Sequence, residues 1–238
     1  QGGVNAYRKF SPDHKNSSNA PRTMSQSNWQ IAHRRSSTNS THAFQEISGY
    51  FSDEEIEAIK QAWRKAHPKI CALWYHLNDA FWDAAHKPGQ LHVVKPSNIE
   101  IVFDDQDFVL PVIWMTLPSG RQLVYPDAEV RNSNFADGKR EGRGLYFNDN
   151  TQGRWRPVRV YGGLICENAV QAVARDLLAE ALLRLDKAGF KIVTHTHDEV
   201  CVEEPKGSKR YELFKTLMNR VPDWAEGLPI TAKAWQSN

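Results

Sequence analysis

The sequence lacks the features that mark disulfide-stapled, secreted and membrane-spanning proteins. It has three cysteines, Cys71, Cys166 and Cys201, whose spacing fits neither a metal site nor a paired disulfide framework. A reducing, cytoplasmic setting is the simplest interpretation of such sparse cysteine usage. No apolar run approaches the ~18 residues of a membrane span, and no basic-then-apolar leader is present. The sequence therefore predicts an intracellular protein with no membrane partner.

Charge of one sign is also scarce. The chain has 30 Lys and Arg residues against 28 Asp and Glu residues, an excess too small to indicate a nucleic-acid partner by itself. Any basic surface must therefore be local. Hydrophobic residues make up 40% of the 238 residues and charged residues 24%, a balance that provides for a sizeable core. The first residue is Gln1 rather than Met, which favours a fragment, a processed product or a trimmed chain.

The segment from residue 11 to residue 42 has little apolar periodicity and is rich in Ser, Asn, Thr and Arg. This composition predicts a flexible insertion. Its basic residues, among them Arg22, Arg34 and Arg35, face a single acid, Asp13. Two interpretations stay open, namely a solvated segment or an arm that touches phosphate groups.

Two helices are predicted after this segment. Ser52 and Glu55 have the spacing of a capping box, so a helix is expected to begin there. Pro68 is expected to split it from a second helix, because proline removes a backbone donor and clashes with the preceding turn. Pro88-Gly89 marks the end of that second helix.

A β-rich block follows the helices. Strands are predicted at residues 99–103, 109–117 and 121–125, with a hairpin turn at Pro118-Ser119-Gly120. Residues 132–150 are polar and glycine-rich, and they are predicted to form a loop.

The strongest periodicity in the chain is helical. Between residues 167 and 187 apolar residues recur at i, i+3 and i+4, and Gly189 is placed to end the helix. The remaining predicted elements are strands at 190–196 and 200–202, a helix around 211–218 and a short β stretch at 229–235.

The residues that carry chemistry lie between the two strands at 190–196 and 200–202. His197, Asp198 and Glu199 are three ionisable residues in a row, and burying them within a strand would be costly. A hairpin tip avoids this cost and exposes Asp198 at an open cleft. Neighbouring carboxylates and imidazoles suit Mg²⁺ or another divalent ion, which serves phosphoryl chemistry. The alternative is a polar turn that binds no metal.

A second metal hypothesis uses the same segment differently. If it formed one extended strand, His195, His197 and Glu199 would project to the same face. Two histidines and a carboxylate form a Zn²⁺ ligand set, so a metal-dependent hydrolase would follow.

Several blocks, in order along the chain, resemble segments of phage-type family A (polymerase I-like) DNA polymerases. Residues 117–126, Leu-Pro-Ser-Gly-Arg-Gln-Leu-Val-Tyr-Pro, resemble one such segment, and residues 161–176, from Tyr-Gly-Gly to Ala-Arg-Asp, resemble a second. Residues 193–199 resemble the His-Asp-Glu of polymerase motif C, and residues 222–230 also match this group. Residues 1–4 resemble the tail of the fingers helix, and the resemblance otherwise runs from Phe44 to near Asn238.

The resemblance implies an α+β fold in which a palm-type sheet packs on helices beside a partial helical fingers region. The implied organisation is residues 1–43 as the end of a fingers helix plus the polar insertion, 44–92 as the remaining helical fingers, and 93–238 as a palm with the motif C hairpin. The implied function is the C-terminal part of a DNA-directed DNA polymerase that acts on primer-template DNA and deoxynucleoside triphosphates in a bacterial host.

The resemblance also implies roles for individual residues. Asp198 and Glu199 would be the catalytic, metal-binding carboxylates of a two-metal mechanism, with two Mg²⁺ ions expected and Mn²⁺ possible as a substitute. His197 would contact the primer end, and Gln171 would face the nascent base pair from the minor groove. Two basic residues complete the implied DNA-binding set, Arg175 on the same helix face as Gln171 and Arg121 on the hairpin at a backbone phosphate.

The sequence departs from the family in three ways. It has no Asp-x-Ser-x-x-Glu motif to supply the first metal-binding carboxylate, and it lacks the Arg/Lys set that holds the triphosphate. Leu164 stands where a lysine usually follows Tyr-Gly-Gly. We therefore expect no polymerase activity without a further, N-terminal polymerase part. A non-catalytic DNA-binding module with a palm-like fold and, less favoured, the hydrolase with His195, His197 and Glu199 remain as alternatives.

Overall fold

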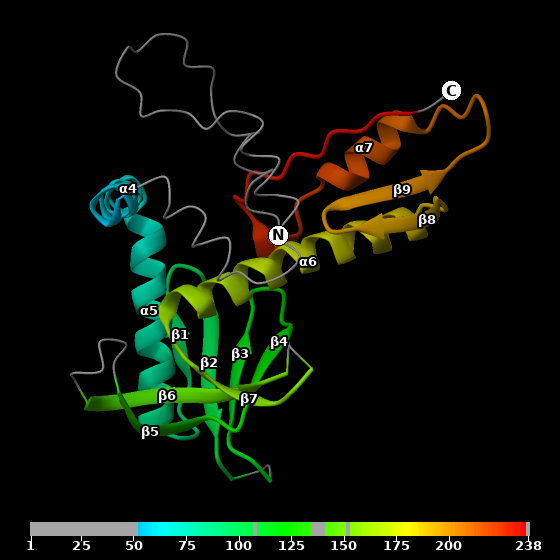
Figure 1. Ribbon diagram of the computed structural model, residues 1–238. Coiled ribbons are helices and arrows are strands. Elements are labelled where there is room, and N and C mark those ends of the chain that lie inside the picture. The colour runs from blue at the N-terminus through cyan, green and yellow to red at the C-terminus, as the bar shows by residue number, and fades with distance from the viewer. Residues whose placement is uncertain (1–51, 107–108, 135–140, 151–152, 237–238) are drawn as a thin grey trace. The chain divides into compact units, whose positions relative to one another are not determined.

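The computed structural model describes residues 52–106, 109–134, 141–150 and 153–236. The chain divides into two compact units, residues 1–68 and 69–238 (Figure 1). The predicted polar insertion at 11–42 lies outside the described residues. The predicted boundaries at 43–44 and 92–93 stay predictions.

Helix α4, Asp53–Ala66, is the described part of the first unit. Its capping box is confirmed, since the Ser52 hydroxyl accepts a hydrogen bond from the backbone N–H of Glu55 at 3.2 Å. The Glu55 carboxylate in turn accepts the Ser52 N–H at 2.8 Å. The helix ends before Pro68, as predicted, and the imidazole of His67 stacks on the ring of Trp63 with centroids 4.4 Å apart.

Helix α5 and a four-stranded sheet form the first layers of the second unit. Helix α5, Pro68–His86, buries Leu77, Phe81 and Ala84. The sheet is antiparallel in the order β1-β2-β3-β4, with strands His92–Val94, Ile99–Asp104, Val112–Thr116 and Gln122–Pro126. The hairpin turn between β3 and β4 is confirmed, and Gly120 there has a φ of 85°.

A second antiparallel sheet occupies the segment that we predicted to be a loop. It has the order β5-β6-β7, with strands Glu129–Asn134, Glu141–Asp149 and Arg156–Arg159. The loop prediction for 132–150 is wrong because Leu145 and Phe147 alternate into the core while their neighbours point away. The Tyr125 ring joins the layers, meeting Phe81 and Phe147 edge to face with centroids 5.0 Å apart in each case.

Helix α6, Gly162–Lys187, is the longest element and starts five residues earlier than the predicted residue 167. Its first half contributes Ile165, Cys166 and Ala169 to the core that α5 and the sheets share. Its end is as predicted. Gly189 adopts a left-handed φ of 75°, and the N–H of Phe190 donates to the Leu185 carbonyl at 3.0 Å.

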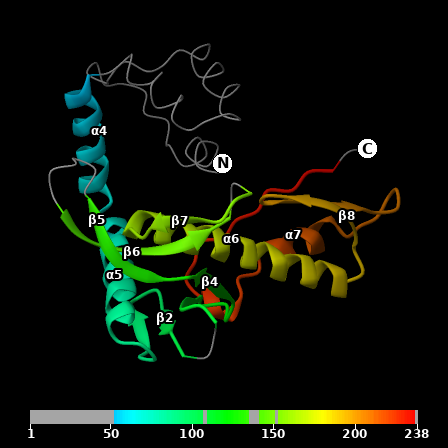
Figure 2. The same ribbon diagram turned by 60° about the horizontal axis from the view of Figure 1, so that its bottom comes forward.

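The second half of α6 packs on strand β8, Lys191–Thr196, and on helix α7, Tyr211–Asn219 (Figure 2). Strand β9, Glu199–Glu203, pairs with β8, and a short 3₁₀ helix, η1, spans Asp223–Ala225. The β stretch predicted at 229–235 is not a strand. This segment is held to α7 by side chains instead: the Asn219 amide oxygen accepts the N–H of Ala232 at 2.6 Å, and the Tyr211 hydroxyl donates to the Ala234 carbonyl at 2.7 Å.

Candidate functional site

The ionisable residues singled out in the sequence sit at the tip of the β8–β9 hairpin. Thr196 and Glu199 are the last paired residues, so His197 and Asp198 alone form the turn. His197 has a φ of 53°, as the primed hairpin turns require at their first central position. Histidine tolerates this left-handed conformation better than most residues. The predicted hairpin tip is therefore confirmed, and residues 195–199 are all exposed.

The tip presents two neighbouring carboxylates, those of Asp198 and Glu199, to solvent. Within the described part of the chain neither is engaged by an ion pair or a hydrogen bond. Carboxylate oxygens are the ligands that Mg²⁺ prefers, so the donor chemistry fits that ion. The set is incomplete, however, because the described residues hold no group of three His, Cys, Asp or Glu that could bind a metal ion.

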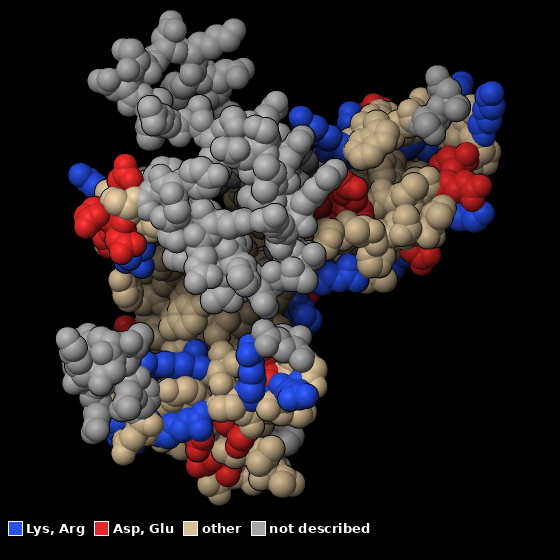
Figure 3. All heavy atoms as spheres, viewed as in Figure 1, with Lys and Arg blue, Asp and Glu red and all other residues tan. Residues whose placement is uncertain are grey.

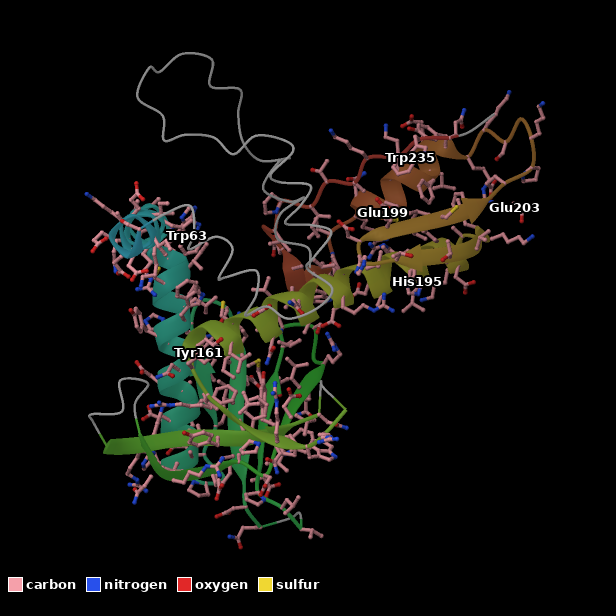
Figure 4. The ribbon with its side chains drawn as sticks, in the orientation of Figure 1. Trp63, Tyr161, His195, Glu199, Glu203 and Trp235 are labelled. Atoms are coloured by element: carbon pink, nitrogen blue, oxygen red, sulfur yellow. The ribbon has the colours of Figure 1, made fainter. Side chains whose placement is uncertain are left out.

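The geometry removes the premise of the zinc hypothesis. His195 lies on β8 and Glu199 on β9, on either side of a reversal in chain direction. Glu199 pairs with Thr196, and successive side chains of a strand point to opposite faces. His195 and Glu199 therefore project to opposite faces of the hairpin (Figure 4). The assumption of one extended strand was wrong.

The position of the tip relative to α6 follows from the chain direction. β8 leaves the C-terminal end of α6 and runs back along the helix (Figures 1 and 2). From Lys191 to His197 a strand covers roughly 20 Å, which corresponds to roughly 13 residues of helix. The β8–β9 hairpin turn thus lies at the level of the middle of α6, close to the helical turn that carries Arg175.

Gln171 and Arg175 are exposed on that part of α6. The Gln171 amide donates to the carboxylate of Glu167 at 3.0 Å, one turn earlier. Arg175 makes no ion pair or hydrogen bond with another residue that the structure describes. The structure therefore leaves both side chains accessible, and their predicted contacts with DNA stay predictions.

Arg121 has a more definite structural environment than the sequence indicated. Its Nε donates to the carboxylate of Asp176 on α6 at 2.5 Å, and a terminal nitrogen donates to the Ala172 carbonyl at 2.7 Å. The hydroxyl of Ser119 donates to the other carboxylate oxygen at 2.5 Å. This set, the Arg121–Asp176 clamp, joins the β3–β4 hairpin to α6. A phosphate contact by Arg121 stays a prediction and would use the part of the guanidinium that the clamp leaves open.

Arg210 anchors the base of the β8–β9 hairpin, and sequence analysis missed it. Its guanidinium donates to the carbonyls of Ala188 and Gly189, pairs with Glu204 at 3.0 Å and lies over the Phe190 ring, 3.9 Å from the centroid. A lone arginine before a helix carries no signal of such contacts. The adjacent Lys191–Glu203 ion pair closes the hairpin base, and the lysine lowers the pKa of the Glu203 carboxyl.

Two hollows of the described surface lie away from the hairpin tip. One, of about 350 Å³, is lined by residues of α5 and β1, among them His76, Asp79, Asp83 and His92. The other, of about 360 Å³, lies beside η1. In the first, Nε2 of His92 is buried without a hydrogen-bond partner among the described residues. Neither hollow includes Asp198 or Glu199.

Comparison with known proteins gives one informative match. The chain is 33% identical over 184 residues to the DNA polymerase of Bacillus phage SP02. The match covers 76% of this chain but only 26% of that polymerase, so the chain spans about a quarter of the curated relative's length. No family model and no solved structure matches. The predicted resemblance to a phage DNA polymerase is thereby confirmed. Among the described residues no helix is long and apolar enough to cross a membrane.

Proposed function

We propose that this chain is one part of a family A-type, template-directed DNA polymerase, in which residues 93–238 form a palm. The similarity to a phage DNA polymerase supports a polymerase-related function. The observation that carries the finer proposal is the hairpin tip, where two adjacent carboxylates are exposed on a sequence that resembles motif C.

Asp198 is proposed as the catalytic, metal-binding carboxylate and Glu199 as its supporting neighbour. When bound, divalent ions lower the pKa of a primer 3′-hydroxyl and stabilise negative charge on the transferring phosphate. The hydroxyl oxygen would bond to the α-phosphorus of the incoming nucleotide as pyrophosphate leaves. Arg175 and Gln171, near the level of the tip, are suited to hold the primer-template, and His197 to contact the primer end.

The proposed site needs ligands from outside these residues. The described part of the chain provides no third ligand near Asp198 and Glu199, and the chain corresponds to about a quarter of the phage relative. The further carboxylate, and the basic residues that would hold the triphosphate, are proposed to come from another polymerase segment. The 238 residues alone are then expected to bind Mg²⁺ weakly and to catalyse no nucleotide addition.

Primer extension tests this proposal. The chain is assayed with Mg²⁺ and four deoxynucleoside triphosphates, alone and mixed with the remaining segment of a related phage polymerase. We expect extension only in the mixture, and a loss of at least about 100-fold in Asp198→Ala because charge stabilisation of this kind is worth several kcal/mol. Asp186→Ala, an exposed acid on α6, is the matched control.

Each other outcome has a distinct meaning. Extension by the chain alone would refute the need for an outside carboxylate. A mixture that extends equally well with Asp198→Ala would refute the assignment of the site. A mixture that binds primer-template DNA without extending it would favour a non-catalytic DNA-binding module.

A further inference from the structure

The β5–β6–β7 sheet has an outward face that the proposed polymerase site does not use. Leu145 and Phe147 point into the core, so the residue between them, Tyr146, points outward. Its partner on β7 is Arg159, and Arg131 on β5 is paired with Gly144. The outward face of this sheet therefore carries arginines around an aromatic ring.

The centre of this face is a stacked pair. The guanidinium of Arg131 lies over the Tyr146 ring, 4.1 Å from its centroid, and also pairs with Glu129 at 3.2 Å. Gly144 makes room for the ring, since a Cβ there would lie 2.6 Å from a ring carbon of Tyr146. Gly144 is buried beneath the ring, so the Tyr146 ring and not the strand backbone forms this part of the outward face.

Further basic residues lie near the two ends of β6. Arg154, Trp155 and Arg156 follow the connection from β6 to β7, and the Trp155 side chain is 65% exposed. Arg154 and Arg156 at this end, and Arg143 at the other, are exposed and make no ion pair or hydrogen bond with another described residue. Arg143 and Arg156 are in register with the core-facing positions of β6, so they border the outward face at its two ends and do not stand on it. Figure 3 shows several Lys and Arg side chains over this part of the molecule, with Asp and Glu side chains beside them.

We infer that this β5–β7 surface, with Arg131 and Tyr146 on the outward face and Arg143, Arg154, Trp155 and Arg156 at its ends, binds single-stranded nucleic acid. Arginines track the phosphate backbone, and an exposed indole offers a platform on which an unpaired base stacks. A duplex keeps its bases stacked on one another and would leave Trp155 without a partner. From Arg143 to Asp149 strand β6 spans roughly 20 Å, which suits the lower end of the roughly 4–16 nucleotides that single-strand sites occupy.

The inference goes beyond the proposed nucleotidyl transfer because binding here requires neither Asp198 nor a metal ion. The β5–β7 surface lies on the β5–β6–β7 sheet and not on the β8–β9 hairpin. In a polymerase, such a surface would hold unpaired template. The two proposals can therefore fail separately, since one concerns binding of a single strand and the other concerns chemistry at the hairpin tip.

Fluorescence anisotropy with the full chain and a short fluorescein-labelled oligothymidylate tests the inference. Trp155→Ala is expected to weaken binding about 5- to 150-fold, the range for removing one stacked base contact. The chain offers a matched control in Trp235→Ala, because Trp235 is 77% exposed but lies in the C-terminal segment. Trp155→Phe should recover part of the affinity because it restores an aromatic face.

Salt dependence tests the arginines. The double variant Arg154→Ala/Arg156→Ala should reduce the slope of log K against log salt by about 1.4, since each phosphate contact on a single strand contributes about 0.7. Lys206→Ala/Lys209→Ala, an exposed pair between β9 and α7, should leave the slope unchanged.

Three results would overturn the inference. They are no binding of the oligonucleotide by the wild type, equal affinities for Trp155→Ala and Trp235→Ala, and tighter binding of duplex than of single strand. Circular dichroism and urea unfolding of each variant ensure that a loss of affinity is not a loss of folding.

Discussion

The contact between α5 and α6 leads to a sharp prediction for two adjacent glycines. A Cβ built at Gly162 would lie 2.0 Å from the Trp74 carbonyl oxygen and 2.6 Å from its carbonyl carbon. An unstrained carbon–oxygen contact is about 3.3 Å or longer. Gly162→Ala therefore forces the start of α6 away from α5 by about 1 Å or more. At Gly163 the nearest atom to a built Cβ is in the Tyr161 side chain, at 3.2 Å, and a side chain can move.

The two substitutions have the same chemistry and opposite expected signs. Alanine favours a helix over glycine by up to about 1 kcal/mol at either position. Overpacking of backbone against backbone costs about 1–3 kcal/mol or more. We expect Gly162→Ala to lower the free energy of unfolding by about 2 kcal/mol, which lowers Tm by roughly 4–8 °C in a domain of this size. Gly163→Ala should leave it unchanged or raise it.

Urea unfolding followed by circular dichroism measures both values. Thiol labelling gives a second readout, because Cys166 lies in this helix contact and burial raises the pKa of its thiol. In a background of Cys71→Ser and Cys201→Ser, Gly162→Ala should accelerate labelling of Cys166, and Gly163→Ala should not. Equal stabilities for the two alanine variants, with equal labelling rates, would refute the backbone-contact reasoning.

Three further predictions concern the core, the clamp and the hairpin tip. Burial raises the pKa of Tyr125 to about 12, so the folded state holds this proton more tightly than the unfolded state. The free energy of unfolding should therefore fall by up to ~3 kcal/mol as pH rises from about 10 to 12. Urea unfolding of Tyr125→Phe at each pH should lack this component. Asp176→Ala should lower the free energy of unfolding by about 2 kcal/mol because it leaves Arg121 without its carboxylate. Asp186→Ala, at an exposed position, should lower it by less than about 0.5 kcal/mol. Equal losses for the two variants would contradict the clamp. His197→Gly should keep or raise Tm because glycine accepts a φ of 53° without strain. The same variant should reduce primer extension by the proposed polymerase. A variant that unfolds more easily than the wild type would argue against strain at the turn.

Periodicity was sufficient for the elements whose residues repeat regularly. The long run of apolar residues predicted most of α6, and two β-branched stretches around His197 predicted the hairpin tip. Strand β6 was missed because Gly142 and Gly144 lower strand propensity, whereas burial of Leu145 and Phe147 stabilises the strand. Such tertiary compensation is invisible in a local window.

Side-chain partners were the least predictable part of the site. The closing segment looked like a strand by composition, but Asn219 supplies the hydrogen bonds that a neighbouring strand would have supplied. The anchor Arg210 and the clamp at Arg121 depend on pairs 22 and 55 positions apart in sequence. Only the fold decides which such pairs meet. The exposed Asp198 and Glu199 were predictable because their own charges exclude them from a strand interior.

The Arg121–Asp176 clamp joins two sequence blocks, residues 117–126 and 161–176, that resemble phage polymerase segments. Asp176 faces the β3–β4 hairpin while its neighbour Arg175 is exposed, so the clamp fixes the rotation of α6 about its axis. In the proposed polymerase, loss of Arg121 would therefore impair activity through geometry even without a phosphate contact. Arg121→Lys separates the two roles, since lysine keeps the charge that attracts a phosphate but not the planar fork that binds Asp176 and the Ala172 carbonyl together. A clamp role predicts that Arg121→Lys loses stability and extension nearly as Arg121→Ala does. If Arg121→Lys instead keeps extension and the salt dependence of DNA binding despite lower stability, the phosphate role prevails.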